Sequence, residues 1–114
     1  MSGKSFSALQ ELIARASEKP LIKARTARMV KAFQFRPSDA APYYLEIVNG
    51  VLKVSSGETS SPVATIIASD EDLAGVVRGT VDPVQLFFAG RIRVQGSIFD
   101  AQELATLLRE AARS

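Results

Sequence analysis

The first apolar pattern along the chain has a helical period. Four apolar residues recur at i, i+3, i+4 and i+7, which places them on one stripe of an amphipathic helix within residues 1–20. Ser5 or Ser7 is suited to cap its start, and Pro20 stands just beyond the expected end. The stripe consists of Leu9, Leu12, Ile13 and Ala16.

From residue 27 the period changes to two, which predicts a β-strand. Phe33 and Phe35 fall on one face, whereas Arg28 and Arg36 fall on the other. Residues 36–39 combine a proline with a serine and an aspartate, a composition typical of a turn.

A β-hairpin is the clearest local prediction. Asn49-Gly50 suits the two central positions of a type I′ turn, because both need a positive φ. Residues 43–48 and 51–55 then pair with Val48 opposite Val51. One face of the hairpin is apolar, and the other carries Glu46 opposite Lys53 as an expected ion pair. The apolar face comprises Tyr43, Leu45, Ile47, Leu52 and Val54.

A strand followed by a helix is expected next. Residues 63–68 are rich in β-branched side chains, and Ser69 before three carboxylates favours the start of a helix. Gly79 suits the position just past the end of that helix. Its apolar stripe is Leu73, Val76 and Val77.

The remaining elements are a short helix, a strand and a last helix. Asp82-Pro83 predicts the start of the short helix, Gly90 its end, and residues 91–95 the strand. Asp100 with Glu103 forms a capping pattern for the last helix. Ile92 and Val94 point inward from the strand, and Leu104, Leu107, Leu108 and Ala111 form the helical stripe.

These elements predict one domain over residues 1–114, with an N-terminal helix in 1–20 and a sheet with covering helices in 27–112. The expected fold class is α+β, with a mostly antiparallel sheet covered by helices on one side.

The apolar side chains exceed what one-sided helices need. In the short helix, Phe87 and Phe88 point roughly one way with Val84, whereas Leu86 points away from them. Such a surplus allows an apolar cavity able to hold a lipid chain. A solid core or a dimer patch explains the same periodicity, so both alternatives stay open. The other residues of this surplus are Phe33, Phe35, Leu73, Val77, Leu104 and Leu108.

Composition argues against catalysis. The 114 residues include neither Cys nor His, which excludes disulfides, thiolate or imidazole metal sites and the usual general base. Phosphate-binding, nucleophile-elbow and calcium-loop motifs are missing as well. The three carboxylates of residues 70–72 are explained by the helix dipole rather than by a metal. The expectation is a protein that is not an enzyme and has no cofactor and no metal.

Charge is unevenly distributed along the chain. Residues 1–36 hold eight basic and two acidic side chains, a net +6, whereas residues 37–114 hold six basic and ten acidic ones, a net −4. A basic N-terminal third is compatible with weak contact with an anionic membrane, but ordinary surface charge is the preferred explanation. Nucleic acid is not expected, because no stacking aromatic lies among these basic residues before Phe33. No signal peptide or membrane span is apparent, so the expected location is cytoplasmic.

The order of pieces between residues 64 and 108 resembles the sterol carrier protein type-2 domain family, and the hairpin at Asn49-Gly50 fits the central strands of that family. The similarity covers nearly all of residues 27–110. The pieces are Ala64-Thr65-Ile66, Ser69-Asp70-Glu71-Asp72-Leu73, Gly79, Asp82-Pro83, the run Phe87-Phe88-Ala89-Gly90-Arg91-Ile92-Arg93-Val94-Gln95-Gly96 and a leucine-rich last helix.

This resemblance implies a non-enzymatic lipid-binding fold with a five-stranded sheet, helices over one face and an apolar tunnel between them. Family members bind sterols, fatty acids, fatty acyl-CoA or phospholipids, and Gly90 and Gly96 would bracket the strand at the tunnel edge. The sequence departs from the family at Ser97-Ile98-Phe99, where an acidic or amide residue is common. The candidate lipid-binding residues are Phe33, Phe35, Leu73, Val77, Phe87, Phe88, Ile92, Val94, Leu104 and Leu108.

A second hypothesis is an interaction module with a closed core. Such a domain would dock a partner enzyme or a second copy of itself through Leu86, Tyr44 and Val48. Delivery of isoprenoid quinone precursors is a special case of the lipid-binding hypothesis.

Overall fold

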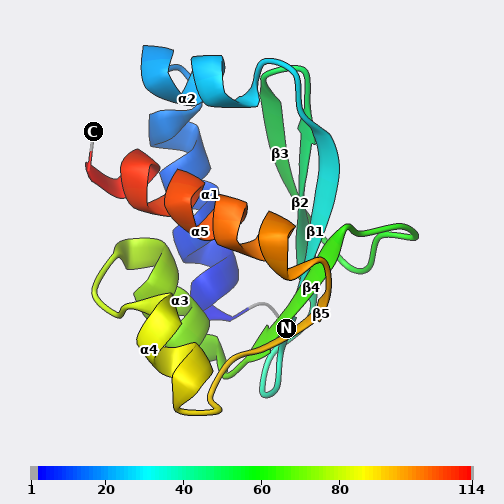
Figure 1. Ribbon diagram of the computed structural model, residues 1–114, viewed down its shortest axis with the longest axis vertical. Coiled ribbons are helices and arrows are strands. Elements are labelled where there is room, and N and C mark those ends of the chain that lie inside the picture. Colours follow the sequence, from blue (N-terminus) through cyan, green and yellow to red (C-terminus); the bar gives the residue numbers. More distant parts are fainter. Residues whose placement is uncertain (1–2, 114) are drawn as a thin grey trace.

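The computed structural model describes residues 3–113, and within them a five-stranded sheet is covered by helices on one face (Figure 1). The strand order is β3-β2-β1-β4-β5; β1 and β4 are parallel and the other neighbours are antiparallel. The expected α+β class with a mostly antiparallel sheet is therefore confirmed. The strands are β1 (Val30–Pro37), β2 (Tyr43–Val48), β3 (Val51–Ser56), β4 (Ala64–Ala68) and β5 (Arg93–Gly96).

The β2–β3 hairpin has the predicted register, with Val48 opposite Val51. Asn49 and Gly50 adopt φ values of 47° and 88°, as a type I′ turn requires. Glu46 lies opposite Lys53, yet no ion pair joins these two among the described residues, so that detail of the prediction is wrong. The buried face of β2 turns toward the helices and supplies Tyr43, Leu45 and Ile47 to the core.

The helices lie together on one side of the sheet, at the left in Figure 1. α1 packs against α3 and also contacts β3 and α5, so the N-terminal helix forms part of the core rather than an appendage. Its predicted apolar stripe is buried. The helices are α1 (Lys4–Ala16), α2 (Pro20–Thr26), α3 (Asp70–Arg78), α4 (Pro83–Phe88) and α5 (Ile98–Arg113).

The start of α1 is capped by a distant carboxylate rather than by Ser5 or Ser7 as predicted. Gly3 occupies the capping position, and Asp70 accepts hydrogen bonds from the Lys4 N–H at 2.7 Å and the Ser5 N–H at 3.0 Å. The buried Ser5 hydroxyl donates to the same carboxylate at 2.6 Å. Asp70 therefore satisfies free N–H groups of a helix that starts 66 residues earlier in the chain.

Pro20 begins a further helix instead of only following the first one. α1 ends at Ala16, and α2 starts at Pro20, where a missing N–H costs nothing because the first helical turn leaves its N–H groups free. The carbonyl of Thr26, at the end of α2, accepts a hydrogen bond from the Gly50 N–H at 2.9 Å. Because α2 extends to Thr26, the first strand begins at Val30 and not at residue 27 as predicted.

Gln34 is fully buried, although its place in the alternation assigns it to the outer sheet face. The loop after β3 folds over that face, and the Gln34 amide donates to the carbonyls of Tyr43 at 2.9 Å and Gly57 at 3.1 Å. The side-chain oxygen of Gln34 in turn accepts a hydrogen bond from the Thr59 N–H at 2.8 Å. A local pattern contains no information about this covering loop.

Two of the three helix starts predicted in the second half are confirmed. Ser69 accepts a hydrogen bond from the Asp72 N–H at 3.1 Å, and Asp82 accepts one from the Val84 N–H at 2.9 Å. Gly79 ends α3 in the left-handed conformation at φ 78°.

Helix α4 turns Leu86 into the core, which contradicts its predicted role as a docking contact. The Leu86 side chain is only 6% exposed, and its carbonyl accepts hydrogen bonds from the N–H groups of Arg91 and Ile92. These bonds connect the end of α4 to the residues that lead into β5. Leu86 and the phenylalanines do point in different directions, as predicted, but Leu86 is the residue that is buried in the core.

Helix α5 begins two residues before the predicted capping pattern. Ser97 accepts a hydrogen bond from the Asp100 N–H at 3.1 Å, so the first turn already includes Ile98. Asp100 and Glu103 instead bind the Lys31 ammonium of β1, at 2.6 and 2.7 Å. This pairing fixes the start of α5 over the sheet.

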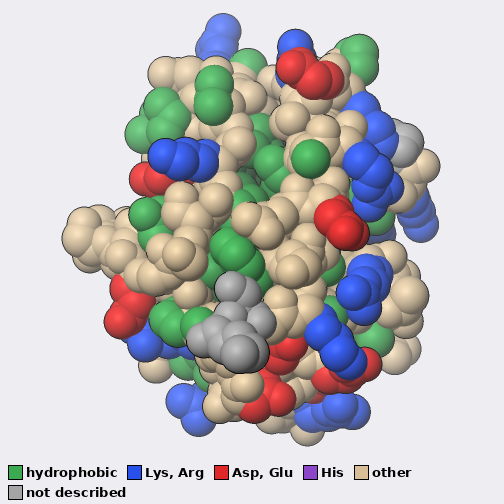
Figure 2. Space-filling model, turned by 180° about the vertical axis from the view of Figure 1, so that it is seen from behind, with side chains coloured by type: hydrophobic (Ala, Val, Ile, Leu, Met, Phe, Trp, Pro, Cys, Tyr) green, Lys and Arg blue, Asp and Glu red, His purple; other side chains and the backbone are tan. Residues whose placement is uncertain are grey.

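Much of the basic excess of the N-terminal third is paired with carboxylates from other parts of the chain. Figure 2 shows acidic side chains beside basic ones along the lower and right-hand edges of the face seen from behind. The charge asymmetry along the sequence is thus largely balanced in space, although each exposed pair adds little stability. The pairs are Lys4–Glu71, Arg25–Glu110, Arg36–Glu58 and Lys31 with both Asp100 and Glu103.

Candidate binding pocket

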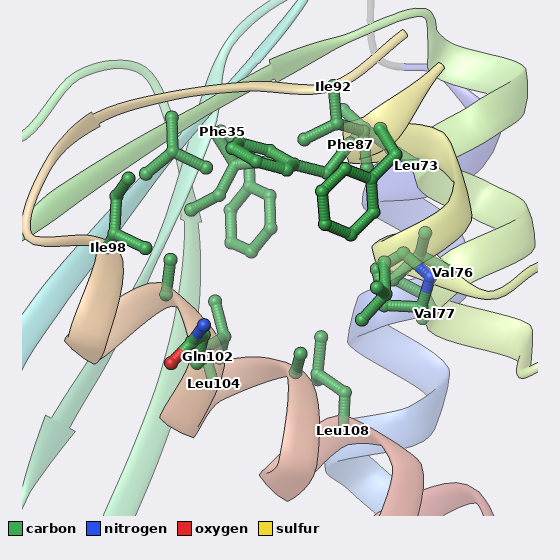
Figure 3. A pocket seen from close by; sticks show the side chains of 17 residues that line it. Phe35, Leu73, Val76, Val77, Phe87, Ile92, Ile98, Gln102, Leu104 and Leu108 are labelled. Carbon is green, nitrogen blue, oxygen red and sulfur yellow. The ribbon is translucent and has the colours of Figure 1, made fainter. Parts of the chain in front are cut away.

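An apolar pocket of about 190 Å³ lies between the sheet and helices α3, α4 and α5 (Figure 3). Seventeen residues line it, and Gln102 is the only one whose side chain is polar. The others are Phe35, Ile66, Leu73, Val76, Val77, Pro83, Val84, Phe87, Phe88, Ile92, Val94, Ile98, Ala101, Leu104, Ala105 and Leu108.

The sheet provides the floor of the pocket. Phe35 and Ile66 are register partners in the parallel pair β1–β4, and Val94 of β5 is the partner of Ile66 on the other side. Partners in a sheet point to the same face, so the three side chains form a row beneath the helices. The Phe35 ring stacks on Tyr43 with centroids 4.9 Å apart, which holds it in place.

The helices provide the walls. α3 presents Leu73, Val76 and Val77 at the i, i+3, i+4 spacing of one helix face. On α5, Ala101 and Ala105 lie one turn apart, and their small side chains leave space that larger residues would fill. In Figure 3, Leu108 and Phe87 point into this space from opposite sides. The hollow therefore results from small residues on α5 facing large ones on the sheet and α4.

The pocket runs from a buried floor to an exposed mouth. Phe35 and Leu73 are each 2% exposed, whereas Phe87 is 42% and Phe88 82% exposed. Gln102 is exposed as well, so the single polar side chain of the lining stands where solvent is accessible. An apolar chain would reach the floor with its polar end left near water.

The structure places nine of the ten predicted residues around this pocket, and Phe33 is the exception. Phe33 is buried on the same face of β1 as Phe35, but two residues earlier in the strand, a shift of about 6.6 Å. It packs in the solid core beyond the floor of the pocket.

The sequence pattern does not predict several of the residues that line the pocket. Ala101 and Ala105 gave no signal because a search for apolar surplus favours large side chains. Ile98 falls between the predicted strand 91–95 and the predicted start of the last helix at Asp100, whereas in the structure the helix begins at Ile98. The other lining residues not predicted as site residues are Ile66, Val76, Pro83, Val84 and Gln102.

Gly96 lets β5 approach β4 closely beside the pocket. Its φ is 87°, and a Cβ at this position would lie 2.7 Å from the Val63 carbonyl oxygen. Only glycine fits both conditions without strain. Of the two glycines expected on either side of this strand, Gly90 and Gly96, the second is therefore required by steric constraints.

The pocket lining can bury an apolar group but offers no reactive side chain. No lining residue is ionisable, and the 3–113 region shows no cluster of three or more acidic residues arranged to hold a metal ion. Nor does any helix in that region combine the length and the hydropathy needed to cross a bilayer. The lining provides a non-directional apolar surface with one amide at its edge.

Known proteins resemble this chain in sequence and in fold. A mouse (Mus musculus) relative, peroxisomal multifunctional enzyme type 2, is 37% identical over 75 residues, which cover 65% of this chain and 10% of that enzyme. The chain thus spans about a tenth of the length of that relative.

Two solved structures share the fold. The sterol carrier protein domain 2 of Helicoverpa armigera superimposes with a TM-score of 0.78 at 24% identity, covering 99% of this chain and 91% of that domain. A ubiquinone synthesis protein, UbiJ-SCP2, gives a TM-score of 0.74 at 19% identity over 92% of this chain and 88% of its own. The sequence profile described as the SCP-2 sterol transfer family matches residues 8–109, and the chain therefore belongs to this family.

Proposed function

We propose that the protein binds the apolar chain of a lipid in the pocket and acts as a carrier rather than as an enzyme. The observation that carries this proposal is an open cavity of about 190 Å³ whose seventeen lining residues include one polar side chain and no ionisable one. A core that served stability alone would be expected to fill such a space, because empty volume costs stability. Family membership points to the same class of ligand.

Binding in this pocket depends on chain length more than on head group. Each buried methylene contributes about 0.8 kcal/mol, whereas the only head-group contact that the lining offers is the Gln102 amide. Fatty acids, acyl-CoA, sterols and isoprenoid chains are therefore all candidate ligands. The name of the ubiquinone synthesis protein with the same fold is a reason to include an isoprenoid quinone among them.

A thermal-shift experiment on delipidated protein tests the proposal. A ligand that binds only the folded state at 100 times its Kd stabilises by about 2.7 kcal/mol. For a chain of this size that corresponds to a rise in Tm of roughly 10 °C. Palmitate, palmitoyl-CoA, an isoprenoid quinone and cholesterol should be compared with butyrate, which has the carboxylate of palmitate but little chain. A rise with at least one long ligand and none with butyrate is expected; unchanged Tm with all four long ligands would refute the proposal.

A further inference from the structure

Helix α4 is the least firmly anchored of the three helices that surround the pocket. Of its six residues only Leu86 is buried, whereas α3 and α5 bury six and four residues. It lies at the lower end of the helical layer in Figure 1. Nevertheless, α4 supplies four of the lining residues, and Phe87 points into the hollow (Figure 3). One wall of the pocket is therefore held in the core by a single side chain.

A lipid chain that packs fully against the floor of the pocket needs more room than the structure gives. Phe35 and Leu73 are each 2% exposed, so even water reaches almost none of their surface. An alkyl chain is wider than a water molecule, and a wall of the pocket therefore has to move before such a chain can pack there. Segments with little buried apolar surface are the ones that open locally at the lowest cost, which favours α4.

The segment that carries α4 is attached to α3 at both of its ends. Before the helix, the N–H groups of Thr80 and Val81 donate to the Gly75 carbonyl at 2.9 and 3.3 Å. A Cβ on Gly75 would lie 2.6 Å from the Val81 side chain, so a residue without a side chain permits this close approach. After the helix, the attachment is an ion pair between Arg91 and Asp72.

This ion pair is bidentate. Arg91 donates from Nε to one carboxylate oxygen of Asp72 at 3.1 Å and from Nη2 to the other at 2.7 Å. The Arg91 N–H also donates to the Leu86 carbonyl at 2.8 Å, which ties the arginine to the end of α4. The Asp72 side chain is 9% exposed and that of Arg91 62%. Such a pair is stronger than a fully exposed one, yet water and salt can still reach it.

We propose that residues 82–90 form a lid over the pocket and that the Arg91–Asp72 pair is the latch that holds this lid closed. When the pair breaks, α4 moves outward about its attachment at Gly75 and an apolar chain can pass. The inference rests on the proposed function, since a lid has a role only if a ligand enters. The latch sets the fraction of molecules whose lid is open. It leaves the affinity unchanged while the closed form predominates, because entry and release pass through the same open state.

Hydrogen exchange of the lipid-free protein tests the latch without a ligand. Arg91→Gln removes the guanidinium and keeps the backbone N–H. Arg93→Gln is the control, because Arg93 is an exposed arginine of β5 that forms no ion pair within residues 3–113. A helix as short as α4 is unstable alone, so an open lid loses its hydrogen bonds. The amides of Ala89 and Ile92, bonded in the closed lid, should exchange about tenfold faster in Arg91→Gln only.

Salt provides a second signature of the latch. A concentration of about 1 M NaCl should accelerate exchange of the Ala89 and Ile92 amides in the wild type, relative to amides of α5, because salt screens the ion pair. It should have no such effect in Arg91→Gln, in which the pair is already missing.

Stopped-flow kinetics with a fluorescent fatty acid test whether the lid controls access. In Arg91→Gln the rate constants for association and release should both rise by about tenfold, with Kd unchanged, because both depend on the open fraction. Arg93→Gln should behave as the wild type. Arg91 does not line the pocket, and a residue that only supported the fold would change Kd instead.

Two results would overturn this inference alone. One is unchanged exchange of the Ala89 and Ile92 amides in Arg91→Gln. The other is faster amide exchange with unaltered ligand rate constants, since the lid would then open without controlling the pocket. A wild-type protein that binds none of the long ligands would refute the proposed function and this inference together.

Discussion

Replacing Ala105 with tryptophan is expected to lower the affinity for a long-chain fatty acid by about 100-fold while the fold stays intact. Ala105 lies on α5 and lines the pocket, so an indole at this position would occupy much of a cavity of about 190 Å³. Excluding three to four methylenes at about 0.8 kcal/mol each corresponds to a loss of that size. The added ring enters existing space, so the usual cost of overpacking is reduced.

Thr106→Trp is the matched control for this change. Thr106 is the next residue of the same helix, does not line the pocket, and bonds through its hydroxyl to the Gln102 carbonyl at 3.2 Å. Displacement of a fluorescent fatty acid should show a large loss for Ala105→Trp and little change for Thr106→Trp. Circular dichroism establishes that both variants are folded. Wild-type affinity in a folded Ala105→Trp variant would exclude this cavity as the binding site.

Asp70→Asn is expected to destabilise the protein by about 2 kcal/mol at pH 7. The Asp70 carboxylate accepts three hydrogen bonds from Lys4 and Ser5, and Ser5 in turn accepts one from the Tyr43 hydroxyl at 2.7 Å. A hydrogen bond to a charged group contributes about 1.5–3 kcal/mol. In the asparagine variant, the side-chain NH2 group would replace one accepting oxygen and would face the N–H or O–H groups of Lys4 and Ser5, which are themselves donors. Glu71→Gln is the control, because the exposed Glu71 forms only a surface pair with Lys4.

The cost of Asp70→Asn should depend on pH. Burial alone raises the pKa of Asp70, but the Ser5 and Lys4 hydrogen bonds outweigh it and hold the pKa below its ordinary value. A carboxylate whose pKa is lower in the folded state than in the unfolded state adds to the free energy of unfolding. This contribution is complete at pH values above the unfolded-state pKa of about 3.9 and is lost as the pH falls through the folded-state pKa. Urea unfolding at pH 7 and below pH 4 should show the gap to wild type closing in acid. A gap that is the same at both pH values would contradict the role of the charge.

Local signals in the sequence were sufficient for much of the fold. The Asn49-Gly50 turn determines the hairpin register, and Ser69 and Asp82 mark helix starts through hydrogen bonds that span only two or three residues. Contacts between distant segments could not be predicted in this way. The Asp70 cap of α1 spans 65 or 66 residues, and Gln34 is buried only because a loop about 25 residues later covers it.

The pocket was predictable from its large residues but not from its small ones. Phe35, Phe87 and Leu108 stood out as apolar surplus and do line it. Ala101 and Ala105 create the space by what they lack, and a search for bulky side chains passes over them. Phe33 lies outside the lining because alternation reports which face of a strand a side chain is on and not how far the pocket extends along that face.

A methyl NMR titration with palmitate tests most directly whether an apolar chain occupies the pocket. If it does, the methyl resonances of Leu73, Val77 and Leu108, which line the pocket, should shift at stoichiometric palmitate. Those of Leu9 and Ile22, which are buried outside the lining, should stay in place. Shifts confined to residues outside the pocket, or no shifts at all, would contradict lipid binding in this cavity.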